Sequence, residues 1–232
     1  MLQAARAQGI ALAPTYGMTE TASQVVTLSP PEFEAGQTGC GRVLPHAQIE
    51  IGEGGAVRVR SRSLAQGYLT ISASGSESSS PLCASFEPFP QDTAGPYLPT
   101  DDLGFFDSAG YLHIVGRSSD KIISGGENIF PAEVEAAIQA TGLVTDVVVL
   151  GVPDADWGER VVAVYTVDGV DAVDGVDAVG AIHAVGSELE ARLRQAIAQS
   201  LCPAKRPKSW VVVAHLPRNA QGKLNRQAVR DY

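Results

Sequence analysis

The spacing of apolar and polar residues changes near residue 117 and divides the chain into two regions. In the first region, short apolar runs are separated by Gly and Pro, which is typical of β-rich structure. Residues 2–17 have the pattern of a helix end that leads into a buried strand. Strands are predicted over 9–17, 47–52, 56–61, 97–107 and 111–116. Residues 71–95 are rich in Ser, Pro and Gly with little periodicity, which predicts a long surface loop.

After residue 117, strands alternate with helices, which predicts a second domain. Strands are predicted over 120–124, 144–153, 160–167 and 209–216, and helices over 131–141, 187–201 and 225–232. Pro131 suits a first helical turn, where its missing N–H needs no partner. Ser187 and Glu190 have the spacing of a capping box at the start of the second helix. The same helix carries an apolar stripe that we expect to be core, formed by Leu189, Leu193, Ile197 and Leu201.

An acidic six-residue repeat, VDGVDAVDGVDAV, interrupts the second region over about residues 167–180. Several carboxylates can bind calcium when they converge on one ion, but valines separate these carboxylates and no bidentate Glu closes the set. An expanded loop or hairpin is the interpretation we favour, because solenoid repeats have periods of roughly 20–50 residues.

Composition narrows the classes of protein that this chain can belong to. With 232 residues, 44% of them hydrophobic, the chain can form one large or two modest domains with real cores. The formal net charge of −9 disfavours nucleic acid or an anionic membrane as a general partner. Cys40, Cys83 and Cys202 are far apart in sequence and lack metal-site spacing, which favours free thiols in a reducing, cytoplasmic compartment. No apolar run reaches the roughly 18 residues of a membrane span.

Four short segments carry candidate chemistry, and each also has a purely structural interpretation. Segment 15–21, TYGMTET, offers small residues and hard oxygen ligands for a magnesium and phosphate site, or it is a polar turn. Segment 97–104, YLPTDDLG, ends a strand with two carboxylates that could grip ribose hydroxyls or face solvent.

The other two segments lie in the second region. Segment 116–131, GRSSDKIISGGENIFP, places small residues at the proposed domain boundary, where a hinge would need them. A diglycine such as Gly125–Gly126 is usually a turn. Segment 216–226, LPRNAQGKLNR, presents Lys223 after a flexible glycine, and a lone lysine there is ordinarily a solvated charge.

Together the four segments, in this order, resemble the adenylate-forming family of acyl-CoA synthetases, peptide-synthetase adenylation domains and luciferases. The resemblance implies an α+β fold in which residues 1–117 are the β-rich end of a large AMP-binding domain and residues 118–232 are a small mobile domain. The stretches YGMTETASQVVTLSP and IISGGENIFPAEVE are most similar to the o-succinylbenzoyl-CoA synthetases of menaquinone and phylloquinone synthesis.

The resemblance implies a reaction with a carboxylic acid, MgATP and CoA: a carboxylate is adenylated, and the CoA thiol then displaces AMP. The implied adenosine site is Tyr16 and Gly17 beside the adenine and Asp102 on the ribose, helped by Arg117. Thr19 and Glu20 would handle phosphate and Mg²⁺, with Glu20 as the metal ligand. Thr21 and Ser23 could contact a second carboxylate of the acid.

For the small domain, the resemblance implies a rotation between the two steps about a hinge at Ser119, where many relatives have Asp or Lys. Lys223 would stabilise developing charge during adenylation. Gly125 and Gly126 would lie beside the pantetheine arm of CoA, where a Cβ could collide with it.

Two departures from the family pattern bear on these expectations. The glycine-rich phosphate loop of the family belongs upstream of TYGMTET, so we expect a chain that holds the C-terminal half of an enzyme and binds a complementary N-terminal half or itself. Asp101 also replaces the glycine that many relatives have before the ribose aspartate.

Three alternatives remain open at this point. One is another aryl or fatty acyl-CoA synthetase, and a second is a peptide-synthetase adenylation fragment, against which the absence of a following carrier domain argues mildly. The third is a catalytically silent module that only binds nucleotide or a partner protein.

Overall fold

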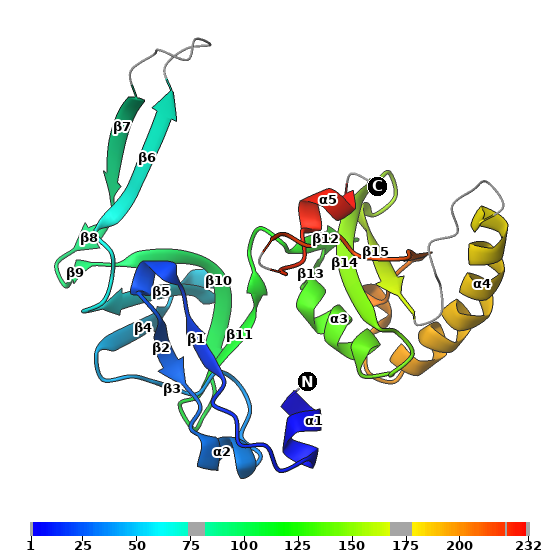
Figure 1. Ribbon diagram of the computed structural model, residues 1–232, viewed down its shortest axis with the longest axis horizontal. Helices are drawn as coiled ribbons and strands as arrows, with labels where there is room; N and C mark the ends of the chain where they lie inside the picture. Colours follow the sequence, from blue (N-terminus) through cyan, green and yellow to red (C-terminus); the bar gives the residue numbers. More distant parts are fainter. Residues whose placement is uncertain (1, 74–81, 168–177, 221, 231–232) are drawn as a thin grey trace. The chain divides into compact units, whose positions relative to one another are not determined.

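The computed structural model describes residues 2–73, 82–167, 178–220 and 222–230 (Figure 1). The chain divides into two compact units, residues 1–115 and 116–232. Each unit has its own hydrophobic clusters of buried residues. The mixed, strand-rich structure agrees with the α+β fold expected from the sequence.

Two small sheets form the body of the first unit. The first has the order β1-β2-β3, with β1 at Thr15–Gly17, β2 at Gln24–Thr27 and β3 at Arg42–Val43. The second has the order β11-β10-β5-β4, with β4 at Ala47–Ile51, β5 at Ala56–Ser61, β10 at Leu98–Phe106 and β11 at Leu112–Arg117. Along β5, Val57 and Val59 are buried and Arg58 between them is exposed, because successive side chains point to opposite faces.

Short helices and irregular segments complete the first unit. Helix α1 spans Leu2–Ala7, α2 spans Pro30–Glu34, and the 3₁₀ helices η1 and η2 span Thr19–Thr21 and Glu53–Gly55. The strand predicted over 9–17 is shorter than expected, since only 15–17 pair with a neighbouring strand. Strand β2 and helix α2 were not predicted from the sequence.

The long surface loop predicted over 71–95 is wrong for much of its length. Strand β6, Gly67–Ala73, pairs along its whole length with β7, Leu82–Pro88, and β8, Gln91–Asp92, pairs with β9, Gly95–Pro96. The guanidinium of Arg60, which is buried, donates to Glu50, to Asp92 and to the carbonyl of Gly95, and so holds the β8–β9 turn. The Ser-rich stretch 74–81 lies outside the described residues.

A single sheet with helices on it forms the second unit. Its strands are β12, Ile122–Ser124; β13, Glu127–Ile129; β14, Asp146–Asp154; β15, Gly158–Thr166; and β16, Ser209–Val212. The order is β13-β12-β15-β14, and β16 pairs with β15 in parallel. The helices are α3, Pro131–Gln139; α4, Ala178–Ile197; η3, Pro203–Lys205; and α5, Arg226–Arg230.

Both faces of this sheet are covered, which explains the continuous valine runs in β14 and β15. On one face Val147 and Val149 belong to a cluster that includes residues of α3 and α4. On the other face Val148 and Leu150 pack with Val229 of α5. A strand buried on both faces has no polar side to alternate with.

Helix α4 begins at Ala178 and therefore extends further towards the N-terminus than predicted. Residue 187 lies inside the helix, so the predicted capping box at Ser187 is wrong: the helical turns before it leave no helix start to cap. The predicted apolar stripe is confirmed, because Leu193, Ile197 and Leu201 are buried and Leu189 packs against the same cluster. Residues 168–177, which hold most of the acidic repeat, lie outside the described part of the chain.

Candidate functional site

The loop that follows β1 is shaped by its own tight packing. A bulge interrupts the pairing of β1 with β2 between Tyr16 and Gly17. A Cβ added at Gly17 would lie 2.2 Å from the carbonyl oxygen of Ser23 and 2.5 Å from the Cα of Gln24. The glycine predicted to lie beside a nucleotide is therefore already required by the close approach of the chain to itself.

Thr21 forms the inside of this loop. Its side chain is buried, and its hydroxyl lies 2.7 Å from the carbonyl oxygen of Ser23 and 3.0 Å from that of Met18. The hydroxyl oxygen of Thr21 also accepts a hydrogen bond from the Met18 N–H, at 3.2 Å. The structure thus places Thr21 where it supports the loop and not where a substrate could reach it, whereas Thr19 and Ser23 are exposed.

The turn after β5 and the start of β6 hold Glu20 in place, which sequence reasoning missed. The Tyr68 hydroxyl donates to Glu20 Oε1 at 2.8 Å, and the Ala65 N–H donates to the Glu20 carbonyl at 2.7 Å. The Ser63 hydroxyl donates to the Thr21 carbonyl at 2.7 Å. These three bonds fix the backbone and the carboxylate of the loop from one side. No periodic signal in the sequence marks them, because the three residues lie in a turn and at the start of a strand.

Two predicted residues, 86 positions apart in sequence, meet across the first unit. The Tyr16 hydroxyl donates to Asp102 Oδ2 at 2.7 Å. Burial raises the pKa of the Tyr16 phenol well above its usual value, and the hydrogen bond to Asp102 raises the pKa further. Tyr16 is therefore a neutral donor at physiological pH. Burial also raises the pKa of the Cys40 thiol, and the charge of Asp102 adds to this shift.

Asp102 lies in an irregular part of β10. Pro99 is paired with Arg58 and Leu103 with Ala56, so the three residues 100–102 face one residue of β5. Such a bulge bends the strand and redirects its side chains. The Thr100 hydroxyl donates to the Val57 carbonyl at 2.8 Å and accepts the Asp102 N–H at 3.2 Å, which fixes the bulge. Asp101, which replaces the glycine of many relatives, lies exposed on this bulge.

Arg117 and Ser119 lie at the end of β11 and in the turn after it. The Asp120 N–H donates to the Arg117 carbonyl and the Lys121 N–H to the Ser118 carbonyl, both at 3.3 Å. Arg117 and Ser119 are exposed. The predicted hinge residue thus stands in an exposed turn near the beginning of the second unit, residues 116–232.

The diglycine forms the turn of a β-hairpin, which differs from the predicted passage from a strand to a helix. Gly125 and Gly126 have φ of +59° and +83° and link Ser124 to Glu127, which are paired across β12 and β13. Positive φ at both central positions is the requirement of the tightest hairpin turns. Strand β13 could not be predicted from the sequence, because a strand of only three residues shows no recognisable period.

The ring of Trp157 lies against one of the two glycines. A Cβ at Gly125 would be 3.0 Å from Trp157 Cε3, whereas a Cβ at Gly126 would have no neighbour within 4 Å. The Gly125 N–H donates to the Trp157 carbonyl at 2.9 Å. The Lys208 ammonium lies 3.8 Å from the centroid of the Trp157 ring. Gly126 is therefore the open side of the turn.

Lys223 lies exposed on a tight loop near the C-terminus. Its N–H donates to Asn219 Oδ1 at 2.9 Å, and its carbonyl accepts the Asn219 N–H at 2.8 Å. Gly222 before it has φ of +77°. Arg218, at the other side of the loop, forms an ion pair with Asp146 of β14 and donates to the Gly222 carbonyl. The loop is thus held at its base, and the lysine extends from it.

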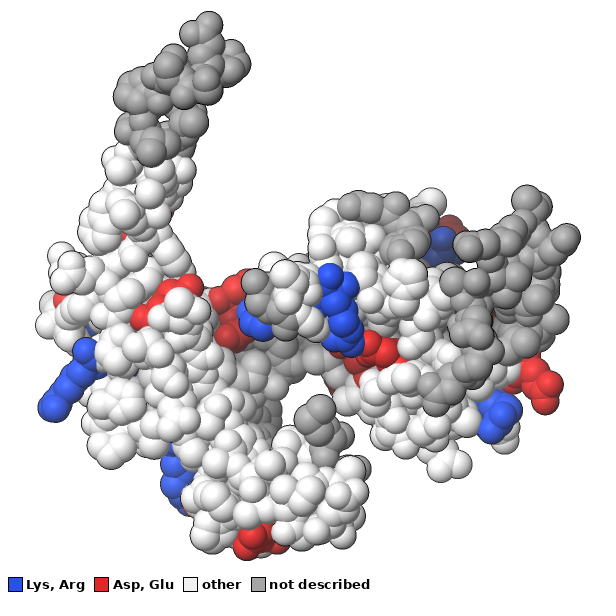
Figure 2. Space-filling view, in the orientation of Figure 1, with Lys and Arg blue, Asp and Glu red and all other residues white. Residues whose placement is uncertain are grey.

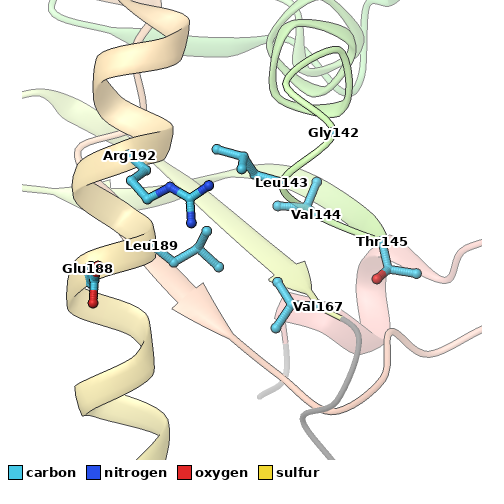
Figure 3. A pocket seen from close by; sticks show the side chains of 8 residues that line it. All are labelled: Gly142, Leu143, Val144, Thr145, Val167, Glu188, Leu189 and Arg192. Carbon is cyan, nitrogen blue, oxygen red and sulfur yellow. The ribbon is translucent and has the colours of Figure 1, made fainter.

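A separate hollow in the second unit has a cavity volume of about 530 Å³. Its lining includes Leu143, Val144, Val167 and Leu189 as apolar side chains, and Arg192 extends over it from α4 (Figure 3). No residue of the predicted site lines it. Within the residues that the structure describes, no group of three or more His, Cys, Asp or Glu could hold a metal ion.

Comparisons with known proteins show which proteins the chain resembles as a whole. Residues 133–223 match the family of AMP-binding enzyme C-terminal domains. The whole chain is 32% identical over 232 residues to the 2-succinylbenzoate–CoA ligase of Listeria innocua and covers 43% of that protein. The chain is thus similar over its whole length to part of a 2-succinylbenzoate–CoA ligase, and part of its second unit resembles the C-terminal domains of AMP-binding enzymes.

Solved structures extend this similarity to the fold. The chain aligns over its full length with 43% of the Bacillus subtilis o-succinylbenzoate CoA synthetase (MenE) in complex with the acyl-adenylate OSB-AMP, with a TM-score of 0.73 and 28% identity. The same enzyme in complex with ATP and magnesium gives a TM-score of 0.71 and 29% identity, over 99% of this chain and 43% of the enzyme. The chain thus spans less than half of the length of these relatives. Among the residues described, no helix is long and apolar enough to cross a membrane.

Proposed function

We propose that the chain is the C-terminal part of an ATP-dependent acid–CoA ligase whose acid is o-succinylbenzoate. The full-length similarity to 2-succinylbenzoate–CoA ligases carries this proposal. In the first half-reaction the carboxylate attacks the α-phosphorus of ATP, and acyl-adenylate and pyrophosphate form. In the second, the CoA thiol attacks the acyl carbon, and acyl-CoA, AMP and a proton are released.

In this proposal the Tyr16–Asp102 pair holds adenosine. The hydrogen bond at 2.7 Å fixes the orientation of the Asp102 carboxylate, and a carboxylate, with two acceptor oxygens, suits the recognition of ribose hydroxyls. The high pKa of Tyr16 keeps its hydroxyl a donor, and its ring has an apolar face that suits adenine. Arg117, at the end of β11, assists at the ribose.

Thr19 and Glu20 handle the phosphates and Mg²⁺. Magnesium is usually held by one or two carboxylates together with substrate phosphates, and a single braced carboxylate at Glu20 fits that pattern. The bound ion would offset the negative charge of the triphosphate. Gly17 and Thr21 keep the loop compact, so that Thr19, Glu20 and Ser23 lie on its outer side, where Ser23 would meet the distal carboxylate of the acid.

In the second unit, Lys223 and the diglycine serve different half-reactions. Lys223 is an exposed ammonium on a loop held at its base, which suits a group that stabilises charge on the α-phosphate during adenylation. Gly126 presents bare backbone on the open side of its turn, which suits contact with the pantetheine arm of CoA. Rotation of the small domain about Ser119 between the two half-reactions would replace Lys223 at the reacting atoms by the diglycine turn.

The proposal is tested by ATP–pyrophosphate exchange with Mg²⁺. The chain is assayed alone and after mixing with the remaining, upstream part of the Bacillus subtilis relative, with o-succinylbenzoate, benzoate and a fatty acid as substrates. We expect exchange in the mixture with o-succinylbenzoate, and its loss with Asp102→Asn. Preference for another acid would contradict the assigned substrate. No exchange in the mixture, together with measurable AMP binding by the chain, would support the nucleotide-binding module instead.

A further inference from the structure

The β6–β7 hairpin carries an apolar face that remains exposed among the residues of its unit that the structure describes. Leu69, Ile71 and Phe86 are 64%, 61% and 55% exposed. Leu69 is paired with Phe86, and Ile71 with Ala84, so these four side chains share one face of the two-stranded sheet. Contiguous apolar surface of this kind on a hairpin marks an interaction site more often than scattered single residues do.

The opposite face of the hairpin is the one that contacts the rest of the first unit. Tyr68 packs edge-on against Phe89, with 5.1 Å between ring centroids, and its hydroxyl donates to Glu20. Because side chains alternate along a strand, fixing Tyr68 inward directs Leu69 and Ile71 outward. The exposure of the apolar face is therefore set by the packing at the base of the hairpin.

The backbone of the hairpin also has unused pairing capacity. Within the described residues, β6 and β7 pair only with each other, so each has an outer edge that no other strand covers. Glu87 is the only charged residue in either strand, and Figure 2 shows their visible face almost wholly white. Natural proteins normally protect such an edge with lysine, proline or a bulge in the strand.

We propose that this apolar face packs against the same face of a second copy of the chain. An apolar stripe is self-complementary under a two-fold axis, because each copy presents the same side chains to the other. The chain carries a net charge of −9, so two copies repel each other electrostatically. The apolar face of the hairpin carries no charge, so two copies can meet there without bringing like charges together.

The size of the face sets the strength that we expect. At the exposures of Leu69, Ile71 and Phe86, the apolar area is about 300 Å² per copy, against roughly 800 Å² per partner in a standard interface. The dimer is therefore a weak one that forms in a concentration-dependent manner.

Sedimentation velocity of the whole chain over a wide concentration range tests the proposal. We expect a monomer–dimer equilibrium that Leu69→Glu with Phe86→Glu weakens at least tenfold. The matched control is Thr70→Glu with Ser85→Glu, which adds the same charge to the paired residues on the opposite face and should change the equilibrium less than threefold. Far-UV circular dichroism shows whether each variant is folded.

Three outcomes would overturn the proposal. The first is a wild-type chain that stays monomeric at the highest concentration, and the second is a dimer that both double variants weaken equally. The third is a chain that is monomeric alone but loses hydrogen–deuterium exchange at β6 and β7 on mixing with the upstream part of the Bacillus subtilis relative. That result would assign the face to the rest of the enzyme and not to a second copy.

Discussion

The diglycine turn gives a prediction whose magnitude follows from the geometry of two adjacent residues. Both glycines have positive φ, where an L-residue is disfavoured by about 1 kcal/mol. Gly125→Ala also brings a Cβ to 3.0 Å from the Trp157 ring, which must shift and so weaken its contact with Lys208, worth about 0.5–1 kcal/mol at an exposed site. Gly126→Ala meets no atom. We therefore expect losses in unfolding free energy of about 2 and about 1 kcal/mol, respectively.

Both tryptophans of the chain, Trp157 and Trp210, lie in the second unit, so intrinsic fluorescence follows the unfolding of that unit. For a unit of this size, about 1 kcal/mol corresponds to roughly 4 °C in Tm. Gly125→Ala should therefore melt about 4 °C below Gly126→Ala. In a Trp157→Ala background, read from Trp210, this gap should close. Equal losses for the two glycines, or a gap that persists without Trp157, would refute the reasoning.

Three further predictions concern the first unit. Tyr16→Phe removes the hydrogen bond to Asp102 and should lower the unfolding free energy by about 1.5 kcal/mol. In a double-mutant cycle with Asp102→Asn the two effects should not add, and additive effects would contradict coupling through this hydrogen bond. Hydrogen bonds from Ser29 and Tyr111 lower the pKa of Glu32 from 4.5 to about 2, so its stabilising effect is present above pH 4.5 and is lost as pH falls towards 2. The stability difference between wild type and Glu32→Gln, measured by circular dichroism, should shrink over that range, and a constant difference would contradict it. Gly17→Ala should lower Tm by several degrees, because its Cβ meets a carbonyl oxygen at 2.2 Å, whereas Gly52→Ala, with its Cβ 3.6 Å from the nearest atom, should leave Tm almost unchanged.

The parts of the fold that the sequence predicted are those where burial produces a pattern. Val147 to Leu150 and Val161 to Val164 are continuous apolar runs because both faces of their sheet are covered. The stripe of α4 follows the helical period because one side of the helix meets the core. Such elements are recognisable wherever one period dominates a window of the sequence.

The elements that the sequence concealed lack such a pattern. In β6 and β7 the apolar side chains of Leu69 and Ile71 are exposed, so the alternation along these strands does not mark a buried apolar face. β13 has three residues, which is too short to show a period, so the sequence predicts only the strand before it and the helix after it.

The candidate site was reached through resemblance, and the long-range contacts within it could not be predicted. Tyr16 and Asp102 come together because two separate sheets end beside each other, and no local spacing encodes that. The brace on Glu20 by Tyr68 depends on a hairpin that the sequence did not predict. The burial of Thr21 depends on two carbonyls brought inward by a turn with φ of +63° at Ala22.

The measurement that tests the account most directly is the rate of each half-reaction in Lys223→Ala and Gly126→Leu, with the chain combined with the upstream part of its Bacillus subtilis relative. We expect Lys223→Ala to lower adenylation by about 100-fold or more and to leave thioester formation from supplied acyl-adenylate nearly unchanged. Gly126→Leu, whose Cβ would have no neighbour within 4 Å, should show the reverse. Equal losses in both half-reactions for either variant would contradict the division of labour between the lysine and the diglycine turn.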